Sequence, residues 1–165
     1  MSKIPSKIPE NKSLSQYDNV KKDYYSLPNG TIINSNPYYL DGLGEFKIDN
    51  GTDRDAVVKL VNTDIEKSVF TVYVKSKNIY RIKKICDGTY KLLFNIGQDW
   101  DKINKRFTVN NSYSKFRKLY NFETHEQTYY DKIETKYSTF EITLHSVIGG
   151  SAKTDNIDPK EFENY

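Results

Sequence analysis

The sequence contains few of the residues that build catalytic and metal centres. Its 165 residues include one cysteine and two histidines. As the single cysteine, Cys86 cannot form an internal disulfide, and its place beside a turn predicts a half-buried thiol. A nucleophilic triad or a zinc site needs a histidine close to serine, cysteine or carboxylates. His125 is expected in a loop and His145 on the polar side of a strand, so we expect no enzyme activity, no metal and no cofactor.

The chain also lacks long apolar runs and a large excess of one charge. No stretch reaches the length of a transmembrane helix, and the first residues hold no apolar run of signal-peptide length. The net charge is +3, from 25 Lys and Arg against 22 Asp and Glu. The two signs are interleaved, which is not typical of a nucleic-acid-binding surface. We therefore expect a cytoplasmic protein with no membrane segment in this chain and no nucleic-acid partner.

Aromatic residues, in contrast, are abundant. The 14 tyrosines and 8 phenylalanines bury large areas, so a core can form although the hydrophobic fraction is only 36%. Together with Val, Ile and Thr they favour strands. The length indicates one domain, which we place at residues 24–165. Residues 1–23 are polar, rich in lysine and repeat the sequence Ser-Lys-Ile-Pro, and they predict a flexible N-terminal arm.

Alternation of polar and apolar residues predicts short strands separated by turns. The clearest of them are residues 55–61, 69–75, 115–122 and 137–147. We interpret residues 95–101 as a loop and residues 123–135 as a long loop or a hairpin tip. Asp158 and Pro159 predict one helical turn near the C-terminus. About eight strands without amphipathic helices between them predict an all-β fold, an antiparallel β-sandwich.

Residues 82–94 predict a tight corner between two strands. Gly88 would supply the backbone angle and Tyr90 would close the edge of the core. This apolar-x-x-apolar-x-x-Gly-x-Tyr run locally resembles the corner strand of prealbumin-like, carboxypeptidase-regulatory β-sandwiches. More of the chain is similar to an uncharacterised bacterial β-rich domain, through residues 50–52, 55–60, 88–90, 97–101, 142–144 and 149–150. Both resemblances imply a β-rich module, and neither implies an activity.

Two acidic segments are candidate ligand sites. Asp53 and Asp55 follow one turn, and Asp99 and Asp101 flank Trp100. Oxygen-rich loops can hold calcium, although this spacing matches no EF-hand. In the alternative that we favour, the carboxylates cap turns by accepting backbone N–H groups. Trp100 then fills the end of the core instead of offering a binding platform.

Pairs of adjacent tyrosines are the second candidate feature. They occur at Tyr24-Tyr25, Tyr38-Tyr39 and Tyr129-Tyr130. Neighbours in a strand face opposite sides, so one tyrosine of each pair is expected on the surface, where tyrosine suits protein partners. We predict a non-catalytic module that binds a protein, with a carbohydrate or small ligand as the alternative. The candidate binding residues are Asp53, Asp55, Asp99, Trp100, Asp101, Tyr129 and Tyr130.

Overall fold

The computed structural model describes residues 23–145 and 152–165. The expected arm, apart from Asp23, and the expected strand end at Gly149-Gly150 lie outside this part of the chain. The described residues form twelve strands, one 3-10 helix and one short α-helix. The elements are β1 (Ile32–Ser35), η1 (Pro37–Tyr39), β2 (Gly44–Asn50), β3 (Asp55–Asn62), β4 (Lys67–Val74), β5 (Asn78–Ile85), β6 (Gly88–Asp101), β7 (Arg106–Phe116), β8 (Tyr120–Phe122), β9 (Thr124–Tyr129), β10 (Lys132–Tyr137), β11 (Thr139–Thr143), β12 (Thr154–Asn156) and α1 (Pro159–Glu163).

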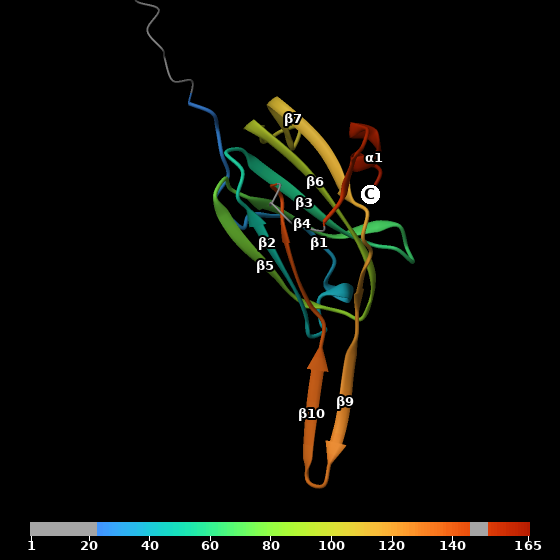
Figure 1. The fold of residues 1–165 in the computed structure, drawn as a ribbon. Coiled ribbons are helices and arrows are strands. Elements are labelled where there is room, and N and C mark those ends of the chain that lie inside the picture. Colours follow the sequence, from blue (N-terminus) through green and yellow to red (C-terminus); the bar gives the residue numbers. More distant parts are fainter. Residues whose placement is uncertain (1–22, 146–151) are drawn as a thin grey trace, which may run out of the picture.

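The strands are arranged in two sheets and a separate hairpin (Figure 1). The large sheet runs in the order β1-β4-β3-β6-β7-β12, and β8 pairs with the first residues of β6. The small sheet runs β11-β2-β5, and in it β11 is parallel to β2. β9 and β10 form a hairpin that extends away from both sheets. The prediction of an all-β fold with mainly antiparallel sheets is confirmed, whereas the sandwich arrangement stays a prediction.

The main hydrophobic cluster joins the two sheets. Phe46 and Ile82 of the small sheet belong to it together with Val58 and Phe94 of the large sheet. A second cluster covers the opposite face of the large sheet and consists of Val57, Val61, Tyr73, Leu93, Trp100, Phe107 and Phe162. Successive side chains of a strand point to opposite faces, so β3 is buried on both sides. This explains its nearly continuous apolar sequence.

Two local predictions are confirmed. At the corner between β5 and β6, Gly88 has a φ of 145° and Tyr90 is fully buried. At the start of α1, the Asp158 side chain accepts a hydrogen bond from the Lys160 backbone N–H at 2.7 Å, and Pro159 occupies the first turn. Among the described residues, no helix is long and apolar enough to cross a membrane.

The predicted loop at residues 95–101 is wrong, because these residues belong to β6. Gly97 and Gln98 suggest a turn, but they sit where the β6–β7 register shifts, as in a β-bulge. The Asn95 side chain donates to Asn111 Oδ1 and to the Ser112 carbonyl, both at 3.0 Å. Gly97 and Gln98, which are typical of turns, therefore lie inside a paired strand.

Two predicted strands are each divided in the structure. Residues 115–122 contain the end of β7 and, after a bend, β8. Residues 137–147 contain the end of β10 and, after Ser138, β11. The Ser138 N–H donates to the Glu123 carbonyl at 3.0 Å, while the Ser138 carbonyl accepts from the Glu45 N–H at 3.3 Å. Because alternation continues through both breaks, periodicity alone could not locate them.

Candidate functional site

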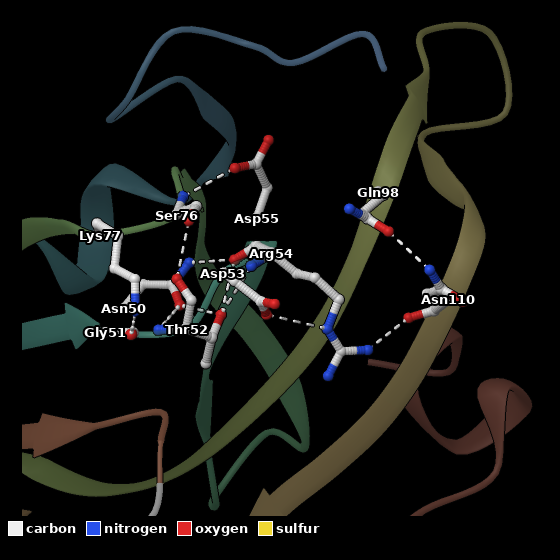
Figure 2. Close-up of polar contacts among 10 residues, drawn as sticks. All are labelled: Asn50, Gly51, Thr52, Asp53, Arg54, Asp55, Ser76, Lys77, Gln98 and Asn110. Carbon is white, nitrogen blue, oxygen red and sulfur yellow. Dashed lines mark hydrogen bonds and ion pairs between the residues drawn. The ribbon is translucent and has the colours of Figure 1, made fainter. Parts of the chain in front are cut away.

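Asp53 lies on the outside of a closed polar turn between β2 and β3 (Figure 2). Buried Asn50 organises this turn, since its Nδ2 donates to the Arg54 carbonyl at 2.9 Å and to the Val74 carbonyl at 3.0 Å. Its Oδ1 accepts from the Thr52 hydroxyl at 2.7 Å. The Asp53 side chain is 90% exposed and lies 3.9 Å from Arg54 Nε. An exposed contact of this length adds little stability.

Asp55 points the other way, into the protein (Figure 2). It is 8% exposed, and its Oδ1 accepts from the Ser76 N–H at 2.8 Å. Its Oδ2 accepts from the hydroxyls of Tyr73 and Ser26. Burial, reinforced by the hydrogen bond to Asp55, raises the pKa of Tyr73 above the usual range of a phenol. Both oxygens of the carboxylate thus accept hydrogen bonds from the protein, which fits a structural role.

Asp99 and Asp101 lie at the end of β6, beside the start of β3, because Asp55 pairs with Gly97. Asp99 has a left-handed backbone, with φ of 60°, and its carboxylate accepts from the Tyr25 N–H at 3.2 Å and the Thr108 hydroxyl at 2.7 Å. Asp101 Oδ1 accepts from the Ile103 N–H at 2.8 Å and the Asn104 N–H at 3.1 Å. Hydrogen bonding to Asn104 lowers the pKa of Asp101. Asp101 therefore caps the β6–β7 turn.

The candidate residues do not all lie together. Asp55, Asp99 and Trp100 are neighbours at one end of the large sheet, joined through Tyr73 and through Tyr25 and Ser26. Trp100 is 6% exposed and packs edge-on against Tyr73 and Phe107, with ring centroids 5.5 and 5.1 Å away. Tyr129 and Tyr130 lie at the hairpin tip, at the other end of the molecule from the end of β6 (Figure 1). Within residues 23–145 and 152–165, no group of three or more His, Cys, Asp or Glu could hold a metal ion.

The tyrosine pairs differ from one another. Tyr38 is 88% exposed, whereas Tyr39 packs against the main cluster, so one tyrosine of this pair is on the surface as expected, although both belong to the 3-10 helix η1 and not to a strand. Both members of the hairpin pair are exposed, Tyr129 by 48% and Tyr130 fully. Tyr130 has a φ of 52° and occupies the turn, so strand alternation does not apply to it.

The β9–β10 hairpin presents two different faces. Residues directly opposite each other in an antiparallel pair share a face. The printed register therefore divides the hairpin into a Thr-rich face and a charged face. The Thr-rich face consists of Thr124, Glu126, Thr128, Ile133, Thr135 and Tyr137. The charged face consists of His125, Gln127, Tyr129, Lys132, Glu134 and Lys136.

Nothing in the described structure covers either face of the hairpin. Every residue from 125 to 137 is exposed, including Ile133 at 69% and Tyr137 at 45%. The hairpin is tied to the body at its base, where the Asp87 carboxylate accepts from the Thr124 N–H and hydroxyl at 2.9 and 2.8 Å. Among the described residues, the side-chain hydrogen bonds and ion pairs of residues 126–137 stay within the hairpin. Of the two interpretations of residues 123–135, the structure shows a hairpin and not a long loop, and its strands are β9 and β10.

Sequence reasoning missed a cavity on the second face of the large sheet. It has a volume of about 270 Å³ and lies between β3, β6, β7 and α1. Val57, Trp100 and Phe162 supply apolar walls, and Lys59 reaches it from the middle of β3. A lysine inside the run Val57-Val58-Lys59-Leu60 was the available signal, because a strand buried on both sides seldom carries a charge.

Two features of the structure have no role in the packing described so far: the exposed β9–β10 hairpin and the cavity beside Lys59 and α1. Comparisons with protein-family models, curated proteins and solved structures find no match for this chain, so its function has to be argued from these features of a β-rich domain.

Proposed function

We propose that this domain is a non-catalytic protein-binding module whose partner docks on the Thr-rich face of the β9–β10 hairpin. The observation that carries the proposal is that every residue from 125 to 137 is exposed, in a hairpin that projects from the body (Figure 1). A two-stranded hairpin is at best marginally stable alone in water. A partner that covers one face would supply the missing packing.

The composition of the hairpin indicates which partner to expect. The Thr-rich face carries β-branched and aromatic side chains, which favour packing against another protein surface. The hairpin as a whole holds three carboxylates and two lysines, from Glu126, Asp131, Glu134, Lys132 and Lys136. This mixture does not favour a polyanion such as nucleic acid.

The lysines also bear on self-association. Both strands of this two-stranded hairpin have an open edge, and Lys132 and Lys136 lie on β10. Lysines on an edge strand oppose pairing between copies of a chain. We therefore propose a different protein as the partner, bound through the face that carries Ile133 and Tyr137.

Site-specific photo-crosslinking tests the proposal. A photoreactive amino acid at position 133 is expected to capture one protein from an extract of the producing cells, and the same label at position 134 is not. Unlabelled wild type should compete with the crosslink. The Ile133→Asp variant should compete at least about tenfold less well, as for a central interface residue worth about 1.4 kcal/mol or more. Gln127→Asp, which adds the same charge to the charged face, is the matched control.

The outcome against the proposal is equally specific. Equal capture from positions 133 and 134, or equal competition by Ile133→Asp and wild type, would remove the Thr-rich face as the docking surface. A crosslink abolished by glycosidase treatment of the extract would favour the carbohydrate alternative instead. That alternative now depends on Tyr129 and Tyr130, because Trp100 is buried.

A further inference from the structure

We infer that the cavity between the large sheet and α1 is a binding site for a small organic anion. Its walls come from β1, β3, β4, β6, β7 and α1, so distant parts of the chain build it together. At about 270 Å³ it lies just below the roughly 300–1,000 Å³ of ordinary ligand pockets. The site therefore suits a small molecule and leaves no room for a polymer.

The apolar side of the cavity favours the organic part of such a ligand. Trp100 and Phe162 are each 6% exposed and Val57 is 4% exposed, and all three line the space. Tyr113 also lines it and packs edge-on against Phe162, with 5.3 Å between the ring centroids. An aromatic or aliphatic group would contact these side chains and displace water from them.

Lys59 favours the anionic part. Its Nζ donates to the Phe162 carbonyl at 2.7 Å and lies 4.5 Å from the centroid of the Phe162 ring. An ammonium group has three donors, and among the described residues this carbonyl is the one hydrogen-bond acceptor found for it. No carboxylate in residues 23–145 or 152–165 lies within ion-pair distance of Lys59. A charged donor that makes no direct ion pair with the described part of the chain thus borders the cavity.

The charged side chains around the cavity are mainly positive, like Lys59 itself. The cavity's side chains include Lys59, Lys105 and Arg106 against the single carboxylate of Glu163. Burial lowers the pKa of Lys59, and Glu163 only partly opposes this. A bound carboxylate, phosphate or sulfonate would favour the charged form of Lys59 and accept hydrogen bonds from its remaining donors. The cavity lies at the far end of β6 from the hairpin, so this site does not depend on the proposed protein partner.

A pair of matched probes tests the site. 3-Phenylpropanoate and its neutral counterpart 3-phenylpropanamide have nearly the same shape and differ in charge. Trp100 is the single tryptophan and lines the cavity, so its fluorescence reports on binding. We expect a saturable change with the anion and binding about tenfold weaker with the amide, the effect of one charge-assisted hydrogen bond.

Variants locate the effect. Lys59→Met should remove the preference for the anion, while Lys47→Met, on the small sheet, should keep it. If Lys59→Met does not fold, the double variant Lys105→Gln/Arg106→Gln at the rim should weaken binding of the anion and leave that of the amide unchanged. Equal affinities for the two probes, no saturable change up to the solubility of the anion, or an unchanged preference in folded Lys59→Met would each overturn the inference.

Discussion

Replacing Asp55 by alanine is the sharpest test of the structural role assigned to this residue. Its carboxylate accepts hydrogen bonds from the hydroxyls of Tyr73 and Ser26 and from the Ser76 N–H. The Tyr73 contact is buried and the other two are partly buried. Asp55→Ala would leave the fully buried Tyr73 hydroxyl without its acceptor. We therefore expect a large loss of stability although the residue is acidic and close to a turn.

The size of the loss follows from these contacts. A buried hydrogen bond to a charged group contributes about 2 kcal/mol, and two partly buried ones contribute about 1 kcal/mol each. The variant also removes the cost of burying the carboxylate, which offsets about 1 kcal/mol of this sum. The net loss is about 3 kcal/mol. For a protein of this size it corresponds to a fall in melting temperature of about 6–12 °C.

Urea unfolding followed by Trp100 fluorescence measures the effect, because Trp100 packs directly against Tyr73. Asp53→Ala is the matched control: its side chain is exposed, and its loss is expected to stay within about 0.5 kcal/mol. A double-mutant cycle with Tyr73→Phe should give a coupling energy of about 1–2 kcal/mol. Additive effects, or equal melting temperatures for Asp53→Ala and Asp55→Ala, would refute the role of the buried carboxylate.

Two further changes test the packing. A Cβ at Gly42 would lie 2.4 Å from the Ile85 carbonyl oxygen and 2.6 Å from the Cys86 Cα. Because both atoms belong to the backbone and cannot easily move, Gly42→Ala should lower the free energy of unfolding in urea by about 1–3 kcal/mol. A variant as stable as the wild type would contradict this close approach. Burial raises the pKa of Tyr120 to about 12 from 10.0, so its contribution to stability is present below pH 10 and is lost as the pH rises toward 12. Tyr120→Phe should thus unfold at higher pH than wild type in an alkaline titration followed by circular dichroism, and an unchanged midpoint would show that Tyr120 does not control it.

Local chemistry made part of the fold predictable from sequence. Gly88 and Asp158 have roles that depend on a few neighbouring residues, a positive φ at a corner and a helix cap, and both predictions are confirmed. The β-branched and aromatic residues of β3 and β4 similarly identified strands without any knowledge of their partners. Such features depend on short-range sterics and hydrogen bonding, which the sequence carries directly.

Long-range pairing made the rest unpredictable. Gly97 resembles a turn residue, but its role as a bulge depends on β7, which lies opposite it in the sheet. The parallel pairing of β11 with β2 joins residues more than 90 positions apart, and nothing in either strand encodes it. The same limit applies to the candidate site. Asp53 and Asp55 are chemically alike and two residues apart, and only tertiary packing makes one exposed and the other buried.

The long strand β6 relates the two proposed sites. Its first residues pair with β8, which leads into the hairpin, and Trp100 near its last residue lines the cavity. At about 3.3 Å per residue, the ends of this strand are about 40 Å apart. Between them β6 pairs with β3 and β7 and buries Leu92, Phe94 and Ile96 in the main cluster. Coupling between distant sites needs an element with two discrete arrangements, and a strand fixed on both edges is poorly suited to provide one. Occupancy of the cavity should consequently leave partner affinity at the hairpin unchanged, so that failure of either proposal leaves the other intact.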